Sequence, residues 1–281
     1  MMADISVADA EKSIKGIAIP PRPALLTEIN NELQKAAPDI NRLSARIAAD
    51  VGLSAAVLKV INSPYFGLRS KVGSISMAVQ LLGIQNVKSI VTGLLLKAAM
   101  SGGGISLERF WDSSEKVARI AAFVASTLPR APRDEAYTLG LFRECGIPLL
   151  MQRFPEYMDT LKFAAGDDRP MVMVEDERHG TNHAVVGFMV ARTWGLPETL
   201  TDALLRHHDP AVFDKNDKAA SGVRTLVAIN YLAEYLNDTV VRMRDNLQWK
   251  QVSDRVLSCL GINMGDLDEL KDDVLNVLQA G

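Results

Sequence analysis

Residues 139–150, Leu-Gly-Leu-Phe-Arg-Glu-Cys-Gly-Ile-Pro-Leu-Leu, form the stretch that decides the fold. Nearly every position is apolar, which predicts a helix buried on most sides within a larger helical domain. Arg143 and Glu144 interrupt this run, and such side chains are rarely buried unless they are paired. The stretch therefore predicts a central helix, from about Asp134 to Arg153, with two charged groups held inside the protein.

The composition around this stretch is that of an ordinary globular protein. The 281 residues are 48% apolar and 23% charged, enough for one large or two modest domains. A formal net charge of −3 argues against a general nucleic-acid partner. The two cysteines, Cys145 and Cys259, have no metal-binding spacing, and Cys145 is expected to be a small core residue.

No segment resembles a targeting signal or a membrane span. Met1 to Lys12 is polar and acidic, whereas a signal peptide needs a basic and then an apolar segment. The longest apolar run, Ile90 to Met100, contains Lys97 and is too short to cross a bilayer. We therefore expect a cytoplasmic location and no membrane partner.

Apolar residues recur with helical spacing along most of the chain, and no strand pattern is convincing, so an all-α fold is predicted. The prolines of Pro20–Pro23 separate a loosely held arm, residues 1–18, from the helices that follow. Ser101–Gly104 contains three consecutive glycines, each of which disfavours a helix by about 1 kcal/mol relative to Ala. This linker divides an N-terminal helical lobe, residues 19–104, from a C-terminal lobe, residues 105–281.

Several motifs occur in a distinctive order. The N-terminal ones are Ile19-Pro20-Pro21-Arg22-Pro23, Asn62-Ser63-Pro64-Tyr65-Phe66-Gly67, Ser74-Ile75 and Ala78-Val79-Gln80-Leu81-Leu82-Gly83. The C-terminal ones are His183-Ala184-Val185-Val186-Gly187, Trp194-Gly195-Leu196-Pro197-Glu198 and His207-His208. In this order they resemble the HDOD family, a relative of the HD and HD-GYP metal-dependent phosphohydrolases. The resemblance implies a two-lobed helical bundle. The Asn-Ser-Pro segment itself is expected to be a tight turn rather than a binding element.

The resemblance also implies a degenerate active site. In catalytic HD proteins, a His-Asp pair on the central helix holds the metal, and Arg143 and Glu144 stand in its place here. Asp112–Ser114 occupies the region of an earlier histidine ligand, and Asn230 aligns with a late aspartate. His183, together with the adjacent His207 and His208, matches histidines of the HD-GYP branch. A dinuclear centre is therefore not expected.

Four interpretations of these residues are considered, and the first is favoured, so no metal or other cofactor is expected. The first is structural, with no cofactor and no catalytic residue: the histidines are hydrogen-bonded core residues, and Arg143 pairs with Glu144, Glu175 or Asp176. The second is a site for one divalent transition metal, Zn²⁺ or Ni²⁺, on three histidines. The third is phosphodiesterase activity. The fourth is a phosphate or nucleotide site formed by Arg143 and protonated histidine. In the second interpretation, the three histidine ligands of the metal would be His183, His207 and His208.

Binding is favoured over catalysis as the function. By resemblance, we expect a non-catalytic regulatory or scaffold protein in bacterial signal transduction, which binds a signalling protein or a small anionic ligand. The alternative is a metal-dependent phosphohydrolase that acts on a nucleotide or cyclic dinucleotide. A groove between the lobes near Gly102 is the expected partner surface. The candidate ligand-binding residues are Arg143, Glu144, Glu175, His179, His183, His207, His208 and Asn230.

Overall fold

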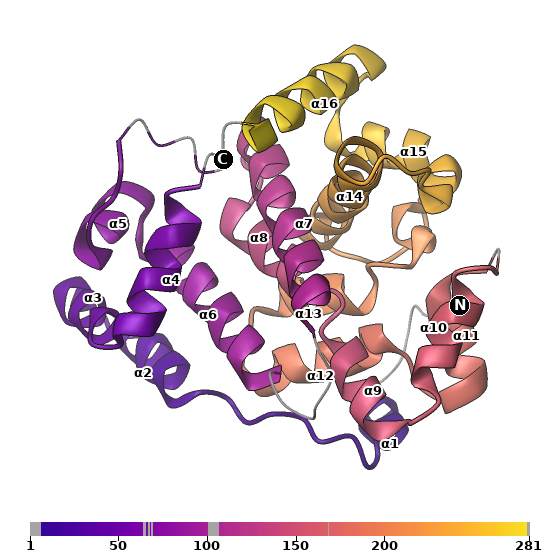
Figure 1. Ribbon diagram of the computed structural model, residues 1–281, viewed down its shortest axis with the longest axis horizontal. Helices are drawn as coiled ribbons and strands as arrows, with labels where there is room; N and C mark the ends of the chain where they lie inside the picture. Colours follow the sequence, from indigo (N-terminus) through magenta and orange to yellow (C-terminus); the bar gives the residue numbers. More distant parts are fainter. Residues whose placement is uncertain are drawn as a thin grey trace.

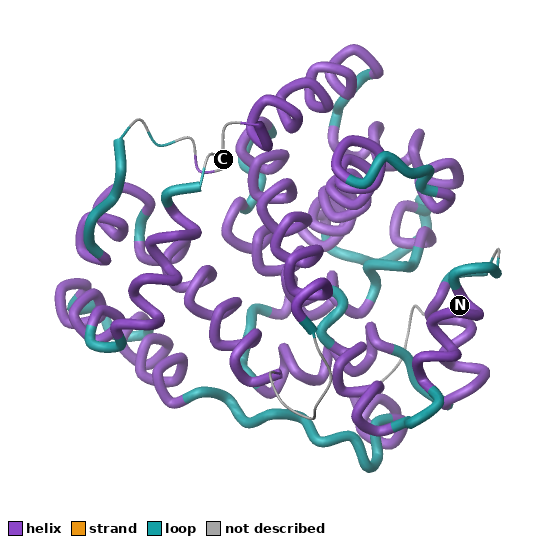
Figure 2. Tube along the Cα trace, viewed as in Figure 1, coloured by secondary structure: helices purple, strands orange, loops and turns teal. Residues whose placement is uncertain are grey.

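A computed structural model describes residues 7–63, 66, 68, 70–100, 107–167 and 169–279. These residues form helices and connecting loops and contain no strand, which confirms the predicted fold class (Figure 2). The N-terminal helices are α1 Val7–Ser13, α2 Ala24–Leu33, α3 Ile40–Ala48, α4 Val51–Ile61, α5 Ile75–Leu82 and α6 Ile84–Met100. The helices that follow are α7 Glu108–Thr127, α8 Arg133–Phe142, α9 Gly146–Arg153, α10 Tyr157–Ala164, α11 Met171–His179, α12 His183–Thr193, α13 Glu198–Leu205, α14 Ser221–Leu236, α15 Leu247–Leu260 and α16 Met264–Gln279. Two short elements complete the set, the 3₁₀ turn η2 at Pro210–Phe213 and the π-helical turn η3 at Asn237–Val241. None of the described helices is long and apolar enough to cross a membrane.

The core lies where α7, α8 and α14 pack against one another, with α6 against the other side of α8 (Figure 1). Helices α2 to α6 form a group at one side of this core, and α9 to α16 surround its other sides. Gly140 permits the close packing of α8 on α7, because a Cβ atom at this position would lie 2.7 Å from the Cα atom of Ala118. Even one methyl group would therefore force the two helices apart.

The central stretch is not the single helix that its composition predicts. Helix α8 ends at Phe142 and α9 begins at Gly146, so Arg143, Glu144 and Cys145 form a turn between two buried helices. Gly146 explains how the second helix fits, because a Cβ atom there would lie 2.2 Å from the carbonyl oxygen of His183. The break turns Arg143 and Glu144 toward the C-terminal helices.

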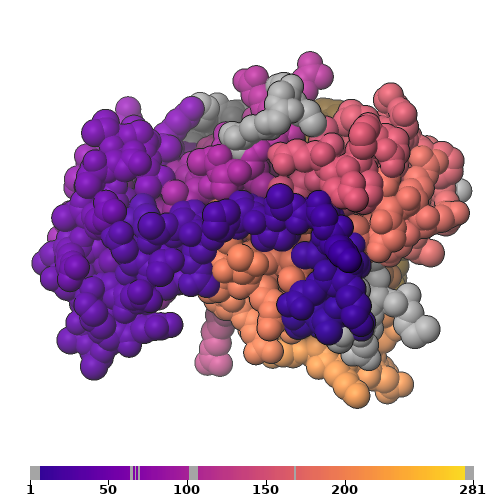
Figure 3. All heavy atoms as spheres, turned by 90° about the horizontal axis from the view of Figure 1, so that it is seen from below, coloured from indigo at the N-terminus to yellow at the C-terminus, as the bar shows by residue number. Residues whose placement is uncertain are grey.

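The N-terminal arm is also better held than the sequence suggests. Helix α1 contacts α12, and Ala10 is fully buried between them. The linker after α1 crosses the surface toward α2 (Figure 3). The indole nitrogen of Trp194 donates a hydrogen bond to the carbonyl oxygen of Pro20 in this linker at 3.0 Å. The expectation of a loosely held arm at residues 1–18 is therefore wrong for the part that forms α1.

The turn after α4 is structural, as expected. The side-chain amide of Asn62 donates to the carbonyl oxygen of Val72 at 2.9 Å and accepts from its backbone nitrogen at 2.7 Å. This pair of bonds holds the chain ten residues ahead, so both the oxygen and the NH₂ group of the amide have a structural partner. Residues 101–106, including the predicted Ser101–Gly104 linker and the Gly102 groove, lie outside the described residues. The lobe boundary there remains a prediction.

Candidate functional site

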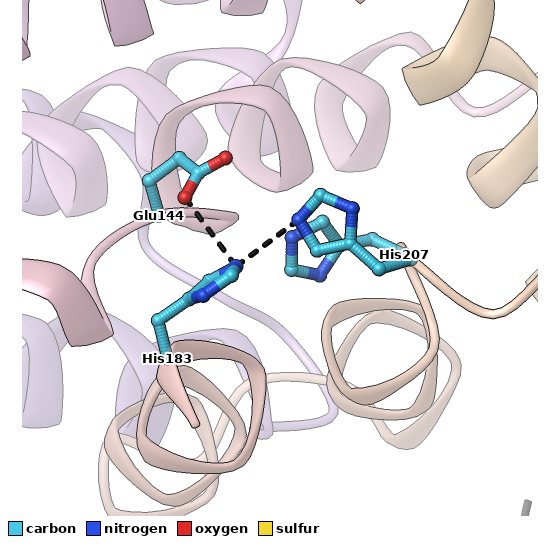
Figure 4. A group of neighbouring side chains, drawn as sticks. Glu144, His183 and His207 are labelled. Carbon is cyan, nitrogen blue, oxygen red and sulfur yellow. Dashed lines mark hydrogen bonds and ion pairs between the residues drawn. The ribbon is translucent and has the colours of Figure 1, made fainter. Parts of the chain in front are cut away.

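Three segments of the chain bring four potential metal ligands together. Glu144 lies in the turn between α8 and α9, His183 is the first residue of α12, and His207 and His208 follow the end of α13. One ligand atom from each of the four lies within 4.8 Å of every other (Figure 4). The Nε2 atom of His183 lies 3.4 Å from Oε2 of Glu144 and 3.1 Å from Nε2 of His208.

The hydrogen bonds of two histidines direct their Nε2 atoms into this cluster. The Nδ1 atom of His207 lies 2.6 Å from the carbonyl oxygen of Leu204, which can only accept, so Nδ1 carries the proton. Its Nε2 atom is buried and has no partner among the described residues. The Nδ1 atom of His183 likewise donates to Oε2 of Glu175 at 2.6 Å. A histidine held in this way presents the lone pair of Nε2, as metal-ligating histidines do.

Glu175, one of the candidate ligand-binding residues, contacts the Nδ1 side of His183. Its carboxylate is fully buried and accepts from the His183 ring, from the His183 backbone nitrogen at 3.2 Å, and from the hydroxyl of Tyr157. Asn182 caps α12 by accepting from the backbone nitrogen of Val185 at 3.0 Å, so the helix start that holds His183 is fixed as well.

Arg143 pairs with Glu144, one of the three carboxylates considered from the sequence, but its nearer partner is Glu234, which was not among them. Its Nε atom donates to Glu234 of α14 at 2.6 Å, and its guanidinium also donates to the carbonyl oxygen of Gly140 at 2.6 Å. Glu144 is farther away, at 3.9 Å. Glu234 lies one helical turn after Asn230, so it shares the helix face on which the late ligand was expected. The four-residue spacing from Asn230 is the sequence feature from which Glu234 could have been identified as a site residue.

A second ion-pair network holds the two adjacent histidines. Arg206 donates to Asp209 at 2.7 Å and to Asp217 at 2.6 Å, and all three side chains are about nine-tenths buried. Because Arg206 and Asp209 flank His207 and His208, the network fixes the turn from which both rings project. Nothing in the sequence identified these carboxylates as partners of Arg206.

The electrostatics of the cluster favour one positive charge on His183. Burial lowers the pKa of His183, but the carboxylates of Glu175 and Glu144 outweigh it and raise that pKa to about 9. Burial and the charge on His183 lower the pKa of His208 to about 4, and burial lowers the pKa of His207 well below its usual range. The His183 proton on Nε2 therefore faces two acceptors, Glu144 and the neutral ring of His208.

Two further predicted site residues are His179 and Asn230. His179 packs against the rings of Phe154 and Tyr157, at centroid distances of 4.5 and 5.4 Å, and contacts the hydroxyl of Thr160 at 2.8 Å. It is thus a core histidine. Asn230 is buried, and its side-chain oxygen and nitrogen have no partner among the described residues.

The donor set fits one transition-metal ion. Three imidazole nitrogens and one carboxylate oxygen form a ligand set typical of Zn²⁺, and the unpartnered Nε2 atom of His207 fits this role. The described residues around the cluster do not provide a site for a second metal ion. The carboxylates of Glu144 and Glu234 are the groups that would hold it, and the Arg143 guanidinium already lies against both.

The cluster forms part of the floor of a cavity of about 590 Å³. Arg143, Glu144, His208 and Glu234 reach this cavity from the cluster side. Its walls are partly apolar, with Phe110, Ile147, Leu161, Met171 and Leu247, and partly charged, with arginines from α7, η3 and the loops. A cavity of this volume accommodates a small organic ligand.

Several solved structures have a fold similar to that of this chain. Three of them cover 96 or 97% of this chain. An HDOD domain protein of unknown function from Geobacter sulfurreducens is 21% identical, with a TM-score of 0.70 and 95% of that chain covered. A protein from Shewanella amazonensis, provisionally described as a phosphohydrolase, is 22% identical, with a TM-score of 0.71 and 94% covered. One from Marinobacter aquaeolei, provisionally described as a signal transduction protein, is 19% identical, with a TM-score of 0.71 and 64% covered. At these identities the likeness shows the fold.

Two uncharacterized proteins are related in sequence. One, from Treponema pallidum, is 24% identical over 193 residues, which is 68% of this chain and 38% of that protein. The other, YuxH of Bacillus subtilis, is 33% identical over 116 residues, 41% of this chain and 28% of that protein. The match therefore spans well under half the length of either relative. The HDOD family matches residues 19–210, more than half of the chain, and the protein belongs to this family.

Proposed function

We propose that this protein is a signal-transduction module whose HD-type site binds a ligand without cleaving it. One divalent transition-metal ion would be held by Glu144 and the three clustered histidines, and a small anionic ligand would occupy the cavity above it. The signalling role is supported by membership of the HDOD family and by the provisional description of the similar Marinobacter protein. The binding role is supported by the site itself.

The Arg143–Glu234 ion pair is the observation that favours binding over catalysis. A guanidinium stays protonated under all relevant conditions and repels cations. Here it lies beside the cluster and engages Glu234 at 2.6 Å, so a two-metal clamp on a phosphoryl group is blocked. A single bound metal would supply a positive charge that attracts an anion and polarises it.

The protein's own groups would prepare the site for that ion. Glu175 and the Leu204 carbonyl orient the imidazoles of His183 and His207, and the Arg206 network holds the turn that carries His207 and His208. The proton on Nε2 of His183 must leave when a metal binds, because a ligating imidazole is neutral. The Arg143 guanidinium would then face the anionic ligand from the same floor.

A direct test measures metal content and turnover on the same preparation. We expect about one transition-metal ion per chain in protein purified without chelator or affinity tag. In an assay with bis(p-nitrophenyl) phosphate, we expect no hydrolysis above that of a His183→Ala and His207→Ala double variant. Turnover that requires the metal and disappears in the double variant would contradict the binding role.

A single-metal phosphohydrolase is the second candidate. It is favoured by one observation, that Glu144 joins the three histidines in a four-ligand set, of which Glu144 and His208 line the cavity. The same turnover assay separates the two candidates, because only the hydrolase predicts hydrolysis by the metal-loaded protein.

A further inference from the structure

The cavity has a second basic region, formed by residues that are not among the metal ligands. Arg109 and Ser113 lie one helical turn apart on α7, so their side chains share one face of that helix. The Arg242 guanidinium, from the end of η3, donates to the Ser113 hydroxyl. Two guanidiniums therefore lie close together on one wall, and all three residues line the cavity.

The carboxylates of the cavity do not neutralise this wall. Asp238 is shared between Arg244 at 2.8 Å and Arg242 at 3.7 Å. The other lining carboxylates have their own cations: Glu144 and Glu234 contact Arg143, Asp167 contacts Arg169, and Asp245 contacts Lys250. Asp112, which also faces Arg242, pairs with Lys116 at 2.8 Å. Arg109 makes no ion pair with any of the described residues.

A buried amide lies beside the same wall. Asn237, at the start of η3, is 2% exposed and lines the cavity, and its side-chain oxygen has no hydrogen-bond partner among the described residues. The two ends of an amide are assigned from the hydrogen-bond network, so a ligand can meet either the oxygen or the NH₂ group. An unpartnered buried amide is costly unless a ligand or water satisfies it.

We propose that Arg109, Arg242 and Asn237 form a subsite for a phosphate-type oxyanion on one wall of the cavity, built from residues other than the metal ligands. Guanidinium groups bind phosphate oxygens through charge-assisted, often paired hydrogen bonds. The Asn237 amide, turned so that its NH₂ group takes the place of the unpartnered oxygen, supplies a further donor. The inference rests on the proposed binding function and deepens it: the natural ligand would carry one anionic group toward the metal ligands and a second toward this wall.

The test uses inorganic phosphate on protein stripped of metal by chelator and dialysed, followed by isothermal titration calorimetry at low ionic strength. Metal removal takes the bound cation away from the floor, and the arginine variants then distinguish binding at the proposed subsite from binding at Arg143. We expect phosphate to bind, and Arg109→Gln and Arg242→Gln each to weaken it by about tenfold, the value of a charge-assisted hydrogen bond. Arg192→Gln, which removes the same charge from an exposed position on α12 outside the cavity, should leave the affinity unchanged.

Three outcomes would overturn the subsite: no phosphate binding to the metal-free protein, unchanged affinity in both cavity variants, or an equal loss in Arg192→Gln. Arg109 is exposed, so its variant is expected to fold even if Arg242→Gln does not. Metal content reports the proposed function separately. Normal metal binding without phosphate binding would remove the subsite alone, and phosphate binding by a protein that takes up no metal would remove the metal site alone.

Discussion

Replacing Glu175 by glutamine tests whether the buried carboxylate prepares His183 as a metal ligand. The carboxylate accepts three hydrogen bonds, two of them from His183 and one from the Tyr157 hydroxyl. A glutamine of the same shape has a single acceptor oxygen, and its NH₂ group would face one of these donors. The variant therefore loses both the charge that orients the imidazole and at least one hydrogen bond.

The expected effect on metal binding is large enough to measure. Loss of a group that orients a metal-bound histidine lowers metal affinity by about 10- to 100-fold. In the metal-free protein, the same change removes the partner of a buried imidazolium and should lower the free energy of unfolding by about 3 kcal/mol. Zn²⁺ affinity is measured by competition with a chromophoric chelator, and stability by urea unfolding of the metal-free protein.

Glu177→Gln provides the matched control. Glu177 lies on the same helix, but its side chain is 65% exposed and contacts only Arg169 at the surface. This variant should bind Zn²⁺ as the parent does and lose less than about 1 kcal/mol of stability. Folded Glu175→Gln protein with parental Zn²⁺ affinity would refute the role assigned to Glu175.

Three further predictions concern the supports of the site. Arg143→Ala should lower the free energy of unfolding by about 3–5 kcal/mol, because it leaves Glu234 buried and unpaired. Adding Glu234→Ala should recover part of that loss in the same urea titration. Gly146→Ala should weaken Zn²⁺ binding at least tenfold, since its methyl group must displace the His183 backbone 2.2 Å away. Asp217→Asn should destabilise the protein by about 1.5–3 kcal/mol at pH 7. The Arg206 guanidinium holds the pKa of Asp217 at about 2, below its ordinary value of 3.8, so this stability is present above pH 3.8 and is lost as the pH falls toward 2.

Each of these has a result that would contradict it. Equal unfolding free energies for Arg143→Ala and the parent would remove the ion pair as a structural support. Parental Zn²⁺ affinity in a folded Gly146→Ala protein would show that the α9–α12 contact does not position His183. A stability difference between the parent and Asp217→Asn that stays constant from pH 7 to pH 2 would exclude the Arg206 network as its source.

The fold class and most helices followed from periodicity, because each helix buries one apolar face against its neighbours. The break at Arg143–Cys145 did not, since its residues suit the end of one helix and the start of the next equally well. What forces the break is the contact between Gly146 and the His183 backbone, 37 positions along the chain. Local patterns contain no information on such long-range contacts.

Only part of the candidate site was predicted, because its remaining contacts also join residues that are far apart in the sequence. His183, His207 and His208 were found by motif, and the structure brings them together with Glu144. The Arg143–Glu234 pair was missed because partner choice depends on how α14 packs against the turn after α8. His179 was included among the candidate ligand-binding residues, yet its ring packs against Phe154 and Tyr157.

The most direct test of the account is the number of transition-metal ions per chain, measured by elemental mass spectrometry on protein purified without chelator or affinity tag. We predict close to one ion in the parent and almost none when His183 and His207 are both replaced by alanine. Two ions per chain would contradict the blocking role of Arg143, and none, after dialysis against Zn²⁺ or Ni²⁺, would contradict the metal site itself.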